Sequence, residues 1–134
     1  MPQPTDIKLR TRSRILEVRF EDGSSFELPF EYLRVFSPSA EVTGHGIGDG
    51  ILQTGKEEVR ITGVEPIGNY ALRLLFDDGH DTGLYTWTVL HDLSLNRDAN
   101  WARYLERCAA AGITRKAGTP QSATMRDHGE GHDD

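Results

Sequence analysis

The sequence predicts a small α+β domain, and two observations carry this prediction. Residues 16–23 align with residues 72–79 at a constant offset of 56, and in each stretch apolar residues alternate at period two before an Asp-Gly pair. A short apolar segment that suits a helix follows each stretch. We therefore expect two half-units, each a β-hairpin followed by a short helix, with a mainly antiparallel sheet and a C-terminal helix.

Each of the two predicted hairpins leads directly into a predicted helix. A strand is expected to end at Phe20 and to return through residues 25–28. Pro29 has no N–H group and suits the first helical position, so residues 30–36 are expected to form a helix that ends near Pro38. The second hairpin returns through residues 82–84 into a helix at 87–93, for which Thr86 is the expected N-cap.

Three further segments complete the chain. Residues 43–50 hold four glycines and are expected to form a loop. An alternating strand at 59–64 and a turn at 66–69 then lead into the second hairpin. The last helix is expected from about Asp98, as N-cap, to residue 111, with Gly112 as the left-handed residue that ends it.

Length and composition indicate one domain. The chain has 134 residues, of which 37% are hydrophobic, so we expect a flexible N-terminus at 1–6, one folded domain at 7–116 and a disordered tail at 117–134. No membrane span or signal peptide is expected, which favours the cytoplasm. Cys108 is the only cysteine, so an intrachain disulfide and any site with two thiolates from one chain are excluded.

The charge distribution suggests one alternative function. The net charge is −6, which argues against nucleic acid as a partner because such binding depends on neutralising phosphates. Lys8, Arg10, Arg12 and Arg14 nevertheless alternate with uncharged residues and would share one face of an extended segment. Binding of an anion or a nucleic acid by residues 8–14 is therefore kept as a second alternative.

Two segments contain residue types that carry chemistry. Residues 50–56 match seven positions of a phosphate-binding loop, but Glu57 replaces the hydroxyl that would reach magnesium, so we do not expect a nucleotide site. Residues 77–81 concentrate three carboxylates and an imidazole. Asp78, His80 and Asp81 are therefore candidate metal ligands, although a polar hairpin turn would have the same composition. No catalytic set of residues stands out.

Three long segments of the chain resemble a known family. Residues 31–46, 64–72 and 76–83, together with the opening at 16–23, resemble the γ-butyrobetaine hydroxylase-like N-terminal domain family over residues 7–107. The resemblance implies a small α+β unit. That family includes stand-alone bacterial proteins of unknown function, a domain that precedes 2-oxoglutarate oxygenases of the carnitine pathway, and a domain attached to iron–sulfur carrier proteins. Hydroxylase activity is not expected, because the catalytic jelly-roll domain has no counterpart here.

The resemblance also bears on metal binding. In the oxygenases this domain holds a structural zinc through three cysteines and a histidine, which correspond here to Ser37, Ser39, Val42 and His80. Serine and valine cannot replace thiolate ligands, so a structural zinc is not expected, and at most zinc or iron would bind weakly. His45, which belongs to the pattern of the stand-alone members, would form an open site with His80 only if the 44–46 loop adjoins the 77–81 turn.

These observations favour a non-catalytic binding or adaptor domain linked to iron–sulfur or 2-oxoglutarate oxygenase systems, with an unknown protein as partner. The expected partner-binding residues lie in and before the glycine-rich loop, whose backbone can fit closely against a partner. They are Arg34, Ser37, Ser39, Glu41, Gly44, His45 and Gly46. The first alternative is a metal-binding protein or metal-dependent enzyme that uses His80, His45, Asp78 and Asp81.

Overall fold

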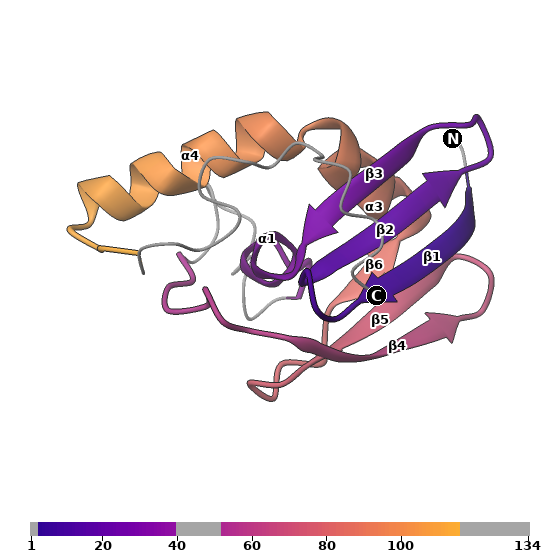
Figure 1. Ribbon diagram of the computed structural model, residues 1–134, viewed down its shortest axis with the longest axis horizontal. Coiled ribbons are helices and arrows are strands. Elements are labelled where there is room, and N and C mark those ends of the chain that lie inside the picture. Colours follow the sequence, from indigo (N-terminus) through magenta and orange to yellow (C-terminus); the bar gives the residue numbers. More distant parts are fainter. Residues whose placement is uncertain (1–2, 40–51, 116–134) are drawn as a thin grey trace.

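Each half of the chain folds as a three-stranded antiparallel sheet followed by a helix, in a computed structural model that describes residues 3–39 and 52–115 (Figure 1). The first half consists of β1 (Pro4–Arg10), β2 (Ile15–Phe20), β3 (Ser25–Pro29) and α1 (Phe30–Val35). The second half consists of β4 (Ile61–Ile67), β5 (Ala71–Phe76), β6 (Leu84–Thr86), α3 (Trp87–Leu95) and α4 (Arg97–Ala110). The predicted α+β class, with two half-units and a C-terminal helix, is confirmed.

The internal repeat extends to the hydrogen bonds of the two hairpin turns. Asp22 Oδ1 accepts from the Ser24 N–H at 2.9 Å, and Asp78 Oδ1 accepts from the His80 N–H at 3.1 Å. The glycine of each turn has a φ of +91°, which glycine adopts without strain. The two turns are therefore copies of one local design, and the chain itself provides a matched control for the second turn.

The strands differ from the prediction in two places. β1 begins at Pro4, inside the segment 1–6 that was expected to be flexible, because pairing with β2 orders it. β4 continues through Pro66 to Ile67, where a turn was expected. Proline is tolerated there because β4 is an outer strand of its sheet and the missing N–H costs no pairing. The first half therefore gains a strand that was not predicted, whereas the second half contains the strand predicted at 59–64, with its bounds shifted to 61–67.

The helix ends are partly as predicted. The Thr86 side chain accepts from the Val89 N–H at 3.2 Å, which confirms it as the N-cap of α3. Asp98 is not the N-cap of α4. The N-cap lies two residues earlier, at Asn96, and Asp98 lies in the first turn, where its negative charge still interacts favourably with the helix dipole.

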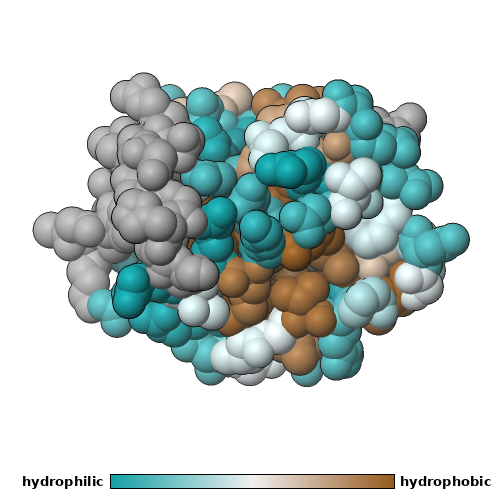
Figure 2. Space-filling model, turned by 45° about the vertical axis from the view of Figure 1, so that its right-hand side comes forward, coloured by the Kyte–Doolittle hydropathy of each residue, from teal (hydrophilic) through white to brown (hydrophobic). Residues whose placement is uncertain are grey.

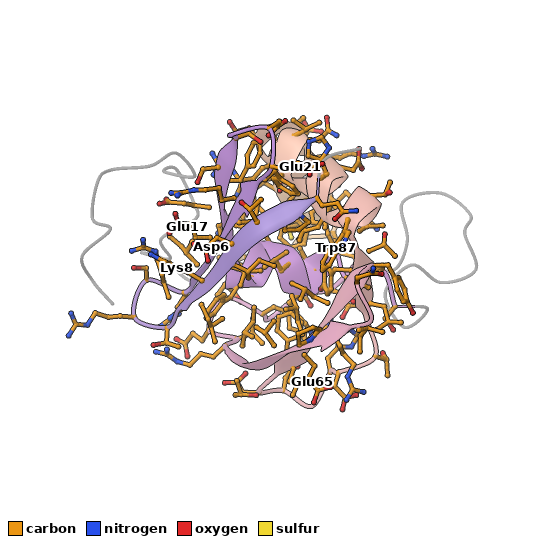
Figure 3. All side chains as sticks on the ribbon, turned by 90° about the vertical axis from the view of Figure 1, so that its right-hand side faces the viewer. Asp6, Lys8, Glu17, Glu21, Glu65 and Trp87 are labelled. Carbon is orange, nitrogen blue, oxygen red and sulfur yellow. The ribbon has the colours of Figure 1, made fainter. Side chains whose placement is uncertain are left out.

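The outer face of the first sheet is charged, but it does not form the predicted basic strip. Lys8 lies opposite Glu17 in the register, and Arg10 forms an ion pair with Glu17 at 2.6 Å. Asp6, Lys8 and Glu17 lie together on one side of the molecule, away from Trp87 (Figure 3). The expectation that four cations share a face is wrong, because β1 ends at Arg10 and residues 11–14 form a turn.

Helix α1 lies at the centre of the core. All six of its residues are buried. The Tyr32 hydroxyl donates to the Leu93 carbonyl and the Tyr85 hydroxyl donates to the Leu33 carbonyl, both at 2.6 Å, so each half is hydrogen-bonded to the other through a buried phenol. The surrounding core comes from the inner faces of both sheets and from α3 and α4. Position and orientation of α1 are thus fixed by both halves.

The core is less well covered between the outer strands of the two sheets. Ile7 and Leu9 of β1 and Val64 of β4 are only partly buried against it. Figure 2 shows apolar surface in the middle of one face, surrounded by hydrophilic residues. In the described part of the chain, none of the helices has the length and apolar character needed to cross a bilayer.

Candidate functional site

A cluster of polar side chains lies where the end of α1, residues 52–56 and the β5–β6 turn meet. Its members are far apart in the sequence and are linked by hydrogen bonds and ion pairs. We name these residues the anchor cluster: Arg34, Ser37, Ser39, Gln53, Lys56, Asp78, His80 and Thr82. Arg34, Ser37, Ser39 and His80 are buried.

The charged half of the anchor cluster centres on Asp78. Its Oδ2 accepts from Arg34 Nε at 2.9 Å and from Lys56 Nζ at 2.7 Å. Arg34 Nη1 also donates to Gln53 Oε1 at 3.1 Å. Burial raises the pKa of Asp78, but the hydrogen bonds from Lys56, the His80 N–H and Arg34 outweigh this effect and lower it to about 2. The carboxylate therefore stays ionised and joins three segments of the chain.

The neutral half of the cluster connects the end of α1 to the second turn. Ser37 Oγ and His80 Nε2 lie 2.9 Å apart and share a hydrogen bond whose direction depends on the histidine tautomer. Ser39 Oγ and Thr82 Oγ1 lie 2.7 Å apart. A Cβ atom on Gly83 would lie 2.3 Å from Ser37 Oγ, so only glycine fits against the buried hydroxyl. Ser37 is fully buried and is not placed to act as a nucleophile.

The structure brings together three of the four positions that correspond to the zinc ligands of the related oxygenases. Ser37, Ser39 and His80 belong to one hydrogen-bonded group, and Val42 lies outside the described residues. His80 Nε2 has a hydroxyl within hydrogen-bond distance. Of the three positions that carry thiolates in the oxygenases, two carry neutral hydroxyls here, and these bind zinc less well than thiolates.

The predicted metal ligands are only partly assembled. Within residues 3–39 and 52–115, no group of three or more His, Cys, Asp or Glu side chains could hold a metal ion. Asp78 and His80 are close but engaged by the anchor cluster, Asp81 is exposed, and His45 lies outside the described residues. A metal bound through His80 Nε2 would have to displace Ser37 from that nitrogen. Metal binding stays a prediction.

The predicted partner-binding residues fall into two groups. Arg34, Ser37 and Ser39 are 7%, 0% and 6% exposed, so they hold the segment in place and present little surface to a partner. The other four lie outside the described residues and stay predictions: Glu41, Gly44, His45 and Gly46.

The members of the cluster that follow the glycine-rich residues 43–50 were not predicted from the sequence. Gln53 was not singled out, and Lys56 was noted only for its place in an incomplete phosphate-binding motif. Gln53 is also held through its backbone, since its carbonyl accepts from the Tyr104 hydroxyl at 2.7 Å. The available signal was the excess of acidic residues in the 77–81 turn, which needs cations from elsewhere in the chain.

The fold and the anchor cluster define a class of small α+β domain, in which two sheet–helix half-units are joined through one buried polar cluster. The chain belongs to the γ-butyrobetaine hydroxylase-like, N-terminal family, whose model matches residues 7–91. The resemblance inferred from the sequence is thereby confirmed. None of the curated proteins matches this sequence.

Solved structures support the same assignment. Two solution structures determined by NMR have TM-scores of 0.75. One is 51% identical and covers 86% of each chain, and the other is 47% identical and covers 94% of this chain and 99% of its own. A crystal structure from Acidithiobacillus ferrooxidans is 41% identical, has a TM-score of 0.57, and covers 69% of this chain and 92% of its own. It is described as a DUF971 family protein of unknown function.

Proposed function

We propose that this domain is a non-catalytic binding module that presents residues 40–51 to a protein partner. One observation carries the proposal: the anchor cluster holds both ends of that segment. Ser37 and Ser39 fix the end that precedes it through His80 and Thr82. Lys56 and Gln53 fix the end that follows it, through ion pairing with Asp78 and hydrogen bonding with Arg34.

Holding both ends favours binding for a thermodynamic reason. A loop whose ends are fixed has fewer conformations to lose when a partner orders it, so more of the contact energy appears as affinity. Four glycines in residues 43–50 allow a partner to approach the backbone closely. The buried polar residues thus act as a support, and the contact with the partner is assigned to the segment between them.

The group to which the partner belongs follows from the resemblance. Related domains are attached to 2-oxoglutarate oxygenases or to iron–sulfur carrier proteins, so we assign the partner of this domain to one of these systems. The anchor cluster supports an adaptor role over a hydroxylase role, because its histidine and its carboxylate are engaged in internal contacts.

Quantitative co-purification tests this proposal. Tagged protein is recovered from native cells as wild type, as Glu41→Ala/His45→Ala and as Glu21→Ala, the last being an exposed control in the first turn. We expect at least one protein to be depleted about tenfold or more with the double variant, which corresponds to about 1.4 kcal/mol of binding free energy. Recovery of the same proteins in equal amounts with all three would contradict the proposal.

A further inference from the structure

A guanidinium group lies against a buried carboxylate and an indole ring after the end of α4. Glu31 of α1 is 1% exposed. Arg115 Nε donates to Glu31 Oε2 at 3.2 Å and Arg115 Nη2 donates to Glu31 Oε1, so the contact is bidentate. The guanidinium carbon lies 5.1 Å from the centroid of the Trp101 ring, within cation–π range. We name Glu31 and Trp101 the guanidinium slot.

The guanidinium slot requires a cation. Burial raises the pKa of Glu31, the hydrogen bond and charge of Arg115 oppose this effect, and the nearby Glu57 adds to the rise. A buried carboxylate that loses its cationic partner is strongly destabilised. Arginine suits the slot better than lysine, because a planar guanidinium can form two parallel hydrogen bonds to Glu31 and lie over a ring at the same time.

The surroundings of the slot also favour a positively charged peptide. A cavity of about 430 Å³ beside the slot is lined by Gly55, Glu57, Glu58, Thr114 and Arg115. Its two carboxylates would attract a basic ligand. Trp101 Nε1 is buried and has no hydrogen-bond acceptor within the described residues. Such a donor is unusual in a folded protein, and it belongs to the same indole ring that the Arg115 guanidinium contacts.

Arg115 is connected to the rest of the fold by a short exposed segment. Helix α4 ends at Ala110, and Gly112 has a φ of +75°. The Ile113 N–H donates to the Cys108 carbonyl at 2.8 Å, which anchors the chain up to that point. Arg115 is two residues further on. Its side chain can therefore leave the slot while α1 and α4 keep their places.

We propose that the guanidinium slot binds an arginine side chain of a protein partner, and that Arg115 fills it until the partner's arginine replaces it. This inference rests on the proposed binding function and names the chemistry of the partner. A tethered side chain competes at an effective concentration in the millimolar range, so Arg115 lowers the apparent affinity for any external guanidinium. Removal of Arg115 then strengthens binding of an external arginine.

The experiment uses the full chain and N-acetyl-arginine methylamide as the probe. Ligand is titrated into wild type, Arg115→Ala, Arg115→Ala/Glu31→Gln and Arg103→Ala, an exposed control on α4. The readouts are the NMR signal of the Trp101 indole N–H, with Trp87 as internal reference, and the melting temperature. For Arg115→Ala we expect saturable shifts at Trp101 and, at ten times the dissociation constant, a rise in melting temperature of about 6 °C.

Wild type and Arg103→Ala should need about tenfold more ligand, which corresponds to a slot that Arg115 leaves open about one tenth of the time. The Glu31→Gln double variant should not respond. An absent response of Arg115→Ala, or an equal response of the double variant, would overturn the inference. If Arg115→Ala is unfolded, Arg115→Lys supplies the same comparison with a cation retained. Failure here leaves the co-purification test of the binding function unaffected.

Discussion

Replacement of Asp78 by asparagine distinguishes the contribution of the anchor cluster to stability from the contribution of the hairpin turn in which Asp78 lies. Asparagine keeps an oxygen that can accept from the His80 N–H, but it removes the charge that faces Arg34 and Lys56. The Arg34 side chain is 8% exposed, so the substitution leaves a buried cation with only the Gln53 amide oxygen among the side-chain acceptors described above. We expect Asp78→Asn to destabilise the domain.

The size of the effect follows from the pKa of Asp78. A fall from 3.8 to about 2 corresponds to about 2 kcal/mol of stabilisation of the ionised form. The Asp78 side chain is 23% exposed, so solvent screening reduces this value somewhat. Loss of the charge that faces Arg34 increases the expected destabilisation again, since breaking a buried ion pair costs more free energy than the pair contributes. About 2 kcal/mol is therefore the expected loss of unfolding free energy.

The matched control is Asp22→Asn in the first turn. Asp22 occupies the equivalent position, accepts the equivalent backbone hydrogen bond and is exposed. Urea unfolding of wild type and both variants, followed by tryptophan fluorescence, gives the free energies and the denaturant slopes. We expect a clear loss for Asp78→Asn and little change for Asp22→Asn, with equal slopes. Equal losses for the two variants would refute the account of the anchor cluster, since the turn alone would then explain both.

Three further predictions follow from the same contacts. Because the pKa of Asp78 is lower in the folded state, its stabilisation is present above about pH 4 and is lost as the pH falls towards 2, so unfolding free energies of wild type and Asp78→Asn should converge across that range. Gly83→Ala should lower the free energy of unfolding by about 1–3 kcal/mol, because the added methyl group overpacks against Ser37. In a double-mutant cycle measured by urea unfolding, Ser37→Ala should recover part of this loss, and full additivity of the two substitutions would argue against the contact. The double variant Ser37→Cys/Ser39→Cys should bind cobalt(II) and show a thiolate-to-cobalt charge-transfer absorption, and adding His80→Ala should weaken that absorption. An unchanged spectrum without His80 would show that the three side chains do not converge on a metal.

The parts of the fold that the sequence predicted are those encoded locally. The Asp-Gly pairs determine both hairpin turns, and Thr86 marks the start of α3, because each depends on a few neighbouring residues. The third strand of the second half was predicted at 59–64, but its bounds moved to 61–67, because an outer strand tolerates Pro66. The third strand of the first half, β1, was missed because it carries charges on its exposed face.

The candidate site was only partly predictable, since its contacts are long-range. Arg34 and Asp78 are 44 residues apart, and Ser37 and His80 are 43 apart. Hydrophobic periodicity carries no information about such pairs. Ser37 and His80 correspond to ligands of one zinc site in the oxygenases that the chain resembles, and the structure places the two side chains 2.9 Å apart here. The resemblance could not show that Arg34 is buried and therefore presents little surface to a partner.

Hydrogen–deuterium exchange of the amide groups tests most directly the claim that one cluster holds both ends of residues 40–51. The comparison is between wild type, Asp78→Asn and Asp22→Asn under conditions in which all three are folded. The account predicts that Asp78→Asn accelerates exchange in residues 36–39 and in residues 52–56 together, although both are distant in sequence from the substitution, and that Asp22→Asn changes neither. Faster exchange confined to residues 76–82 would contradict it, because the ends of the segment would then be held independently of Asp78.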